Sequence, residues 1–235
     1  MTKPDIITVW PTNCDYPLWR QFVRDSRDLF NEIIIAFHNT NQGHDFRQFI
    51  QESMRSDYVH FVDNVEIPGS RDWRDVLVNS ALLHSYNSEW IWFTEQDFII
   101  KDGFFINVEK LSHEHSVVGF YEGVRLHPAC LFMTREVLKN TSRDFSVNPG
   151  VWDHFGKIER DIWDMDISKG IIDENTYKHM NGLSHNMSLV YRGEKANYKP
   201  DEFIEYMRMS LAVKVPIDSR FVEIANEAIE ASCGV

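Results

Sequence analysis

The sequence is poor in cysteine and in long apolar runs, and each shortage excludes a class of protein. Cys14, Cys130 and Cys233 stand far apart and form no CxxC pair. Such an odd, sparse set argues against a disulfide framework and against a zinc site. The longest apolar runs, such as residues 33–37, are far too short to span a bilayer. Since residues 1–5 also lack the pattern of a signal peptide, we expect a soluble, cytoplasmic protein.

Two phosphate-binding glycine motifs are also missing. The chain contains neither GxxxxGK(S/T) nor GxGxxG, so neither a P-loop nor a dinucleotide fingerprint is present. Basic residues are outnumbered, because 24 Lys+Arg stand against 36 Asp+Glu and give a net charge of −12. This balance argues against affinity that comes from nucleic-acid phosphates, although a local basic groove stays compatible with it. Apolar residues make up 43% of the chain, which is enough for a core and excludes general disorder.

The order of apolar patterns predicts an α/β fold. Short apolar runs typical of strands alternate with helical spacing in the first half of the chain, with strands expected at 6–10, 33–37, 58–62 and 90–93 and helices at 18–30, 46–54 and 76–86. The second half is less regular, with strands expected at 117–121, 130–133 and 188–191 and helices at 135–139, 152–163 and 221–231. Alternation of this kind indicates a mostly parallel sheet with helices on both faces, formed as a single domain.

Polar residues follow each of the first four expected strands. They are Pro11–Asn13, His38–Asn41, Asp63-Asn64 and Glu95–Asp97. Ligands of open α/β sheets bind beyond the carboxyl ends of the strands, where these residues are expected to lie. Any one such segment is also typical of an ordinary turn. The agreement of all four favours a functional edge.

The triplet Glu95-Gln96-Asp97 concentrates negative charge at the end of an apolar strand. Two carboxylates held that close repel one another unless a cation or a proton intervenes. Hard oxygen ligands suit Mg²⁺ or Mn²⁺, which proteins bind through one or two carboxylates together with substrate phosphates. The alternative interpretation is a pair of solvated acids at a strand end.

The stretch from Arg74 to Asp97 resembles the GT-A glycosyltransferases, and within them the family-two-like nucleotide-diphospho-sugar transferases. In that family a helix bearing an Asn leads to a hydrophobic strand that ends in an Asp-x-Asp motif. Here Asn79 takes the Asn position and Glu95-Gln96-Asp97 takes the acidic motif, with Glu in place of the first Asp. A looser likeness covers residues 5 to 160. It has Asp153-His154 where two acids are usual, and it lacks a Gln-x-x-Arg-Trp motif.

The resemblance implies one GT-A-like (Rossmann-like) domain over 1–235. Residues 1–100 would bind the nucleotide sugar, and residues 101–235 would form the acceptor half and a C-terminal helix. The activity implied is transfer of a sugar from a nucleotide-diphosphate donor to a hydroxyl, with Mn²⁺ or Mg²⁺ as cofactor. The donor would be bound by Pro11, Thr12, Asn13, His38, Asn39, Arg74, Asn79, Glu95 and Gln96.

The resemblance also implies roles for a few ionisable residues. Asp97 is the preferred candidate for a direct metal ligand, and Glu95 would act through the ribose or a metal-bound water. A His from the C-terminal region completes the metal site in many such enzymes. His179 and His185 are the candidates here, and His185 is preferred because Gly182 marks a loop nearby.

Inverting transfer needs a carboxylate base, for which Asp153 is the candidate. Retaining transfer needs none, and the choice between the two stays open. Glu159 and Asp161 lie further along the same expected helix and are predicted to be solvated. Trp152, beside Asp153, is the aromatic residue expected to contact an acceptor.

Two other functions stay open. A nucleotidyltransferase would use a related sheet, but residues 11–15 lack the Gly-rich loop with a basic residue that those enzymes carry. A non-catalytic nucleotide or sugar binder would have no need of the acidic pair. The hydroxyl acceptor could be a glycan, a lipid, a protein or a small molecule, and the acidic charge makes a nucleic-acid base the less favoured choice. The helix at 221–231 could also form a homodimer contact.

Overall fold

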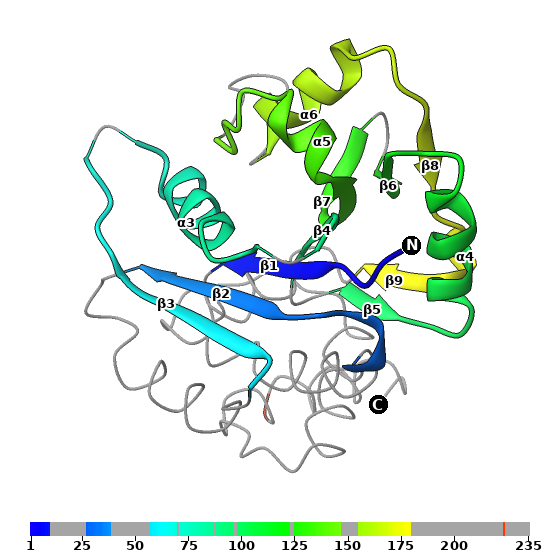
Figure 1. The fold of residues 1–235 in the computed structure, drawn as a ribbon, viewed down its shortest axis with the longest axis horizontal. Coiled ribbons are helices and arrows are strands. Elements are labelled where there is room, and N and C mark those ends of the chain that lie inside the picture. Colours follow the sequence, from blue (N-terminus) through cyan, green and yellow to red (C-terminus); the bar gives the residue numbers. More distant parts are fainter. Residues whose placement is uncertain are drawn as a thin grey trace.

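The computed structural model describes residues 1–9, 27–38, 57–69, 71–86, 88–95, 98–122, 125–146, 155–179 and 223. The large strands are β1 (Asp5–Val9), β2 (Ile33–His38), β3 (Val59–Val65), β4 (Trp90–Thr94), β6 (Val117–Glu122) and β7 (Arg125–Thr134). Three short strands follow the same chain order: β5 (Phe98–Ile100), β8 (Lys169–Ile171) and β9 (Tyr177–His179). The helices are α3 (Trp73–Leu82), α4 (Phe104–Ser112), α5 (Arg135–Lys139) and α6 (Gly156–Asp164), with short 3-10 turns at Arg27–Leu29 and Glu174–Thr176 (Figure 1).

Most of these strands form one mixed sheet in the order β3-β2-β1-β4-β7-β6-β8. β1 pairs in parallel with β2 and β4, β2 pairs in parallel with β3, and β6 pairs in parallel with β8. Only β7 runs antiparallel to its neighbours in this described sheet. The mixed, mostly parallel sheet predicted from the sequence is therefore confirmed. β5 and β9 form a separate two-stranded antiparallel sheet.

Successive residues of the central strands pack into two different cores, one on each face of the sheet. Ile7, Ile34 and Phe93 join the core with buried residues of α3, α5 and α6. Ile6, Ile33 and Trp92 join the core with residues of α4 and β5 on the other face. Because both faces are covered, β2 and β4 are apolar along nearly their whole length, as parallel strands buried on two sides must be.

Two segments with turn-forming residues lie within strands, and one of them was expected to be a turn. Asp63 and Asn64 lie inside β3, which pairs with β2 as far as Val65, so the prediction of a loop there is wrong. His127-Pro128 lies inside β7, where the register with β6 shifts between Gly119 and Tyr121. Proline cannot donate to a ladder and is tolerated at such a bulge, so the turn chemistry is real but interrupts only one strand.

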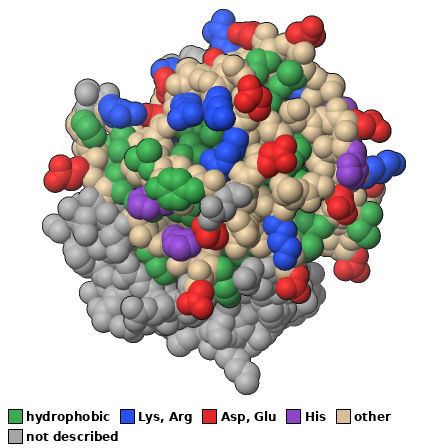
Figure 2. Space-filling model, in the orientation of Figure 1, with side chains coloured by type: hydrophobic (Ala, Val, Ile, Leu, Met, Phe, Trp, Pro, Cys, Tyr) green, Lys and Arg blue, Asp and Glu red, His purple; other side chains and the backbone are tan. Residues whose placement is uncertain are grey.

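Several expected elements fall outside the described residues. These are the helix at 46–54, the strand at 188–191, most of the helix at 18–30, and the tail at 221–231 except Glu223. Within the described part of the chain, no helix is both long and apolar enough to cross a membrane. Acidic side chains are interspersed with basic and apolar ones over the described surface in the view of Figure 2.

Candidate functional site

The connections of the parallel strands change side at β1. β2 and β3 lie on one side of β1, whereas β4, the next strand in the chain, lies on its other side. Such a switch point opens a crevice at the carboxyl ends of the two diverging strands. Ile7 pairs with Phe93 across this boundary, and Val9 pairs with Ala36 on the other side of β1. Glu95, two residues beyond Phe93, therefore follows β4 at the carboxyl edge of the switch point.

Glu95 is positioned through its backbone. Its N–H donates to the carbonyl oxygen of Ala129 at 3.2 Å, and the Thr94 hydroxyl donates to the same oxygen at 3.0 Å. Ala129 belongs to β7, so the end of β4 is fastened to its antiparallel neighbour. The Glu95 side chain is half-buried. Gln96 and Asp97, the rest of the acidic triplet, lie outside the described residues.

The small sheet pairs His179 with the residue that follows this triplet in the sequence. Phe98, the residue directly after Asp97, pairs with His179 in the β5–β9 ladder. The His179 ring lies 4.5 Å from the ring of His127 and 5.4 Å from that of Phe120, centroid to centroid. The two candidate histidines therefore differ, because His179 is described and pairs with Phe98. His185, the preferred candidate from the sequence, lies outside the described residues.

His127 is a neighbour of this site that the sequence did not indicate. It sits in the bulge of β7 and is only 6% exposed. Its Nδ1 accepts a hydrogen bond from the backbone N–H of Ala129 at 3.0 Å, and its ring stacks on Phe120 at 5.1 Å. The sequence signal was the pair His127-Pro128, which indicates a change in backbone direction but not the neighbours of the ring.

Two predicted donor-binding residues lie on α3. The guanidinium carbon of Arg74, in the first turn, lies 4.4 Å from the centre of the Trp73 ring. The Asn79 amide donates to the backbone oxygen of Asp75 at 2.9 Å, to Asp75 Oδ1 at 2.8 Å and to the backbone oxygen of Arg143 at 3.1 Å. Asn79 thus joins α3 to the segment after α5. Its role toward a donor stays a prediction.

The other predicted donor-binding residues are less fully described. His38 ends β2, at the same edge as Glu95, but only its backbone is described. Pro11, Thr12, Asn13 and Asn39 lie outside the described residues, as Gln96 does. Their proposed contacts with a nucleotide stay predictions.

An aromatic cluster packs against β4 on the face of the sheet that α3, α5 and α6 cover. Phe145 and Phe155 each have ring centroids 5.4 Å from that of Phe93, and 4.9 Å from one another. The N–H of Phe155 donates to the carbonyl oxygen of Phe145 at 3.0 Å, and Phe155 has a left-handed backbone with φ of 65°. The predicted base, Asp153, precedes Phe155 by two residues in the sequence and lies outside the described residues.

The same segment carries an ion pair. Lys157 Nζ donates to Asp144 Oδ2 at 2.8 Å. Partial burial raises the pKa of Asp144, but hydrogen bonds from Lys157 and Ser146 outweigh burial and lower the pKa overall. The pair joins the beginning of α6 to the segment before it.

Glu159 is not solvated, and that prediction is wrong. It is 2% exposed and lies on the inward side of α6 with Ile158 and Ile162. The pKa of Tyr121, in β6, is raised mainly by burial of the tyrosine and, to a smaller extent, by the negative charge of Glu159. Asp161 is half-buried and accepts hydrogen bonds from the backbone and hydroxyl of Ser142. Glu159 is therefore a buried carboxylate in the half of the chain assigned to the acceptor.

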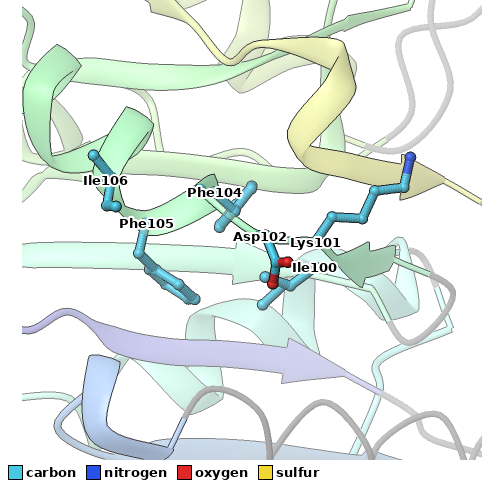
Figure 3. Close-up of a pocket in the computed structure, with 7 residues that line it drawn as sticks. Ile100, Lys101, Asp102, Phe104, Phe105 and Ile106 are labelled. Atoms are coloured by element: carbon cyan, nitrogen blue, oxygen red, sulfur yellow. The ribbon is translucent and has the colours of Figure 1, made fainter.

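Among the described residues, no group of three or more His, Cys, Asp and Glu could hold a metal ion. A cavity of about 240 Å³ lies at the turn between β5 and α4, lined by Ile100 to Ile106. Figure 3 shows Asp102 and Ile100 near its centre and Lys101 pointing away from them. Its described lining includes neither Glu95 nor His179.

No protein-family model and no curated protein matches the sequence. Among solved structures, residues 1–349 of S. aureus TarS are similar over 97% of this chain and 71% of that chain, with a TM-score of 0.53 and 12% identity. Mycobacterium tuberculosis glucosyl-3-phosphoglycerate synthase, solved with Mn²⁺, UDP and glucosyl-3-phosphoglycerate, covers 83% of this chain and 82% of its own, with a TM-score of 0.49 and 13% identity. Likeness at such identities shows the fold, and the chain has the GT-A fold that its sequence predicted.

Proposed function

We propose that this protein is a metal-dependent glycosyltransferase that moves a sugar from a nucleotide-diphosphate donor to a hydroxyl acceptor. One observation carries the proposal. On a GT-A sheet, Glu95 follows the central strand β4 at the switch point, and the β5–β9 ladder brings His179 opposite the residue that follows Asp97. This arrangement supports a site that combines acidic and imidazole groups near the edge where open α/β sheets bind ligands.

The residue types proposed for this edge are ones that bind divalent cations. Asp97 would hold it, Glu95 would act through the ribose or a metal-bound water, and His179 would add a nitrogen ligand. A site that includes an imidazole favours Mn²⁺ over Mg²⁺, because Mg²⁺ is bound by oxygen ligands and keeps much of its water. His185 remains a candidate from the sequence, but the position of His179 supports that residue.

The difficult step of the reaction is departure of the nucleotide diphosphate. A bound divalent ion supplies charge neutralisation for the two phosphates without a proton transfer. The chain itself would bind the base and ribose through Pro11–Asn13, His38 and Asn39, which follow β1 or end β2. Arg74, held over the Trp73 ring, would contribute positive charge from the first turn of α3. Asn79 would support this helix by its bonds to Asp75 and Arg143.

Two carboxylates are candidates for the base of an inverting reaction. Asp153 keeps the role that the resemblance implies, since it precedes the aromatic cluster under β4. Glu159 is a second candidate because it is a carboxylate buried beside Tyr121, in the half of the chain assigned to the acceptor. A retaining reaction would need neither group as a base.

Donor hydrolysis tests the proposed function. We would screen nucleotide sugars with Mn²⁺, with Mg²⁺ and with a chelator, and measure release of the nucleotide diphosphate. Slow hydrolysis that requires the divalent ion is expected. Asp97→Asn should reduce it by about 100-fold or more, since it removes the carboxylate proposed to hold the divalent ion that neutralises the leaving group. Asp102→Asn is the matched control, because Asp102 is exposed and lies five residues further along the chain.

The outcomes separate the three functions. Metal-dependent binding followed by release of the nucleotide diphosphate supports transfer. Metal-independent binding with no turnover would identify a non-catalytic binder, and release of pyrophosphate from a nucleoside triphosphate would identify a nucleotidyltransferase. Full activity of Asp97→Asn contradicts the proposed site.

A second experiment assigns the base. Asp153→Asn and Glu159→Gln should be compared in kcat once an acceptor is found, with Mn²⁺-dependent donor binding as the measure of an intact donor site. Loss of the base lowers kcat by about 100-fold or more while donor binding persists. If neither substitution lowers kcat, the base assignment fails for both residues, and the anomeric configuration of the product should then be retained.

A further inference from the structure

The bulge of β7 fixes the protonation of one imidazole. His127 Nδ1 accepts from the Ala129 N–H at 3.0 Å, and a nitrogen that accepts a hydrogen bond carries no proton. The proton of a neutral His127 must then be on Nε2. A doubly protonated ring would lose the bond to Ala129, because both nitrogens would then be donors. The backbone therefore selects the Nε2–H form.

The same backbone segment holds the acidic motif. The carbonyl oxygen of Ala129 accepts from both Glu95 N–H and the Thr94 hydroxyl. The N–H and the carbonyl of a single residue thus fix the His127 ring on one side and the end of β4 on the other. Any movement of the bulge would shift the two together.

The His127 ring is enclosed by rings. It stacks on Phe120 with an interplanar angle of 24° and lies 4.5 Å from the His179 ring at 52°. With 6% exposure, it has little freedom to turn. His179 is half-buried, and its own orientation is limited by His127 and Phe120.

We infer that His127 is a positioning residue, which sets the orientation of the His179 imidazole beside the acidic motif and is not itself a metal ligand. The inference rests on the proposed function, since it concerns the metal site proposed there. A ligand histidine needs a deprotonated nitrogen facing the ion, whereas His127 has one nitrogen bonded to the backbone and a proton on the other. Residues that orient metal ligands commonly change metal affinity by about 10–100-fold when they are replaced.

Substitution of His127 by asparagine distinguishes the effect of the ring from the effect of its bond to the bulge. An Asn side-chain oxygen can accept from the N–H two residues later, as His127 Nδ1 does, so His127→Asn keeps the backbone bond and removes the ring beside His179. We would titrate the protein with Mn²⁺ alone and follow binding by electron paramagnetic resonance, without donor or turnover. His127→Asn should weaken Mn²⁺ binding by about 10-fold or more. His60→Asn, on the exposed side of the edge strand β3, should leave it unchanged.

A double-mutant cycle tests whether His127 acts through His179. His179→Asn should weaken Mn²⁺ binding, and adding His127→Asn to that variant should cause no further loss, because the ligand it positions is gone. Equal, additive losses would overturn the inference and make His127 an independent ligand. Unchanged binding in His127→Asn, while His179→Asn and Asp97→Asn both weaken it, would overturn this inference and leave the proposed function intact. Unchanged binding in all three variants would refute the metal site itself.

The tautomer can be measured directly in the unsubstituted protein. Long-range ¹H–¹⁵N spectra distinguish a protonated ring nitrogen from a bare one. Without metal, His127 should show a bare Nδ1 and a protonated Nε2, and addition of a diamagnetic divalent ion in place of Mn²⁺ should leave that pattern unchanged. A proton on Nδ1 would overturn the inference even if the substituted proteins failed to fold.

Discussion

Arg135→Met should destabilise the protein without affecting the proposed site. Asp5, at the beginning of β1, is fully buried and accepts hydrogen bonds from Ser85 at 2.6 Å and Ser88 at 2.7 Å. Arg135 Nη2 lies 3.3 Å from Asp5 Oδ2, and the same guanidinium donates to the Ser85 hydroxyl and to the Ser88 carbonyl. Methionine retains most of the packing of the arginine stem and removes the charge and all of these bonds.

The cost follows from these contacts. Two hydrogen bonds to neutral groups contribute about 1 kcal/mol each, and one to a carboxylate contributes about 1.5–3 kcal/mol. Breaking a fully buried ion pair costs about 3–5 kcal/mol. Arg135 is 25% exposed, so water can partly replace it beside Asp5 and the low end applies. We expect a loss of about 3 kcal/mol.

Urea unfolding measures this loss. Arg135→Met should lower the midpoint without changing the slope, whereas Lys139→Met, on the exposed side of the same helix, should change stability by less than about 0.5 kcal/mol. Adding Asp5→Asn should recover part of the loss, because it removes the uncompensated charge. A loss below about 1 kcal/mol, or strict additivity of the two substitutions, would refute the reasoning. Binding of a nucleotide sugar to the folded variant should be unchanged, because Arg135 lies at the amino ends of β1 and β4.

Three further predictions concern other parts of the fold. Gly170→Ala should cost about 1–3 kcal/mol in urea unfolding, since its Cβ would come within 2.9 Å of a neighbouring side-chain carbon, whereas Gly69→Ala, with nothing within 4 Å, should cost almost nothing. Glu159→Gln should lower the pKa of Tyr121 in an ultraviolet titration, but burial should keep it above 10.0. Folding lowers the pKa of Asp144, so its carboxylate adds stability above about pH 4 that is lost as the pH falls, and Asp144→Asn should reduce the difference in stability between about pH 7 and about pH 3.

The central strands could be predicted from the sequence because they are buried on both faces and almost every residue in them is therefore apolar. Residues 33–36 of β2 and 90–94 of β4 are buried without interruption. A strand covered on both faces must be continuously apolar, so length and composition alone identify it. Topology then places the polar residue that follows such a strand at the carboxyl edge of the sheet. For this reason the amino-acid pattern is sufficient to predict that Glu95 lies at this edge.

The histidine contacts could not be predicted in this way. β5 and β9 have only three residues each, which is too short for a periodic pattern, and they come from distant parts of the chain. The burial of Glu159 escapes prediction for a different reason. Its neighbours Arg160, Asp161 and Asp164 are charged, and this composition hides the inward face that Ile158 and Ile162 mark. The pairing of β5 with β9 and the rotation of α6 are tertiary properties, and they decide which ionisable residues meet.

The polar residues at the two ends of the sheet are held by different kinds of partner. At the amino end, both oxygens of Asp5 are bonded to side chains of the protein itself, from Ser85, Ser88 and Arg135. This carboxylate already has hydrogen-bond partners within the folded protein, and a ligand could bind it only by displacing them. At the carboxyl end, the backbone N–H of Glu95 donates to the carbonyl oxygen of Ala129, and His127 Nδ1 accepts from the N–H of Ala129. Because Ala129 makes both bonds, the bulge of β7 sets the positions of Glu95 and His127 together.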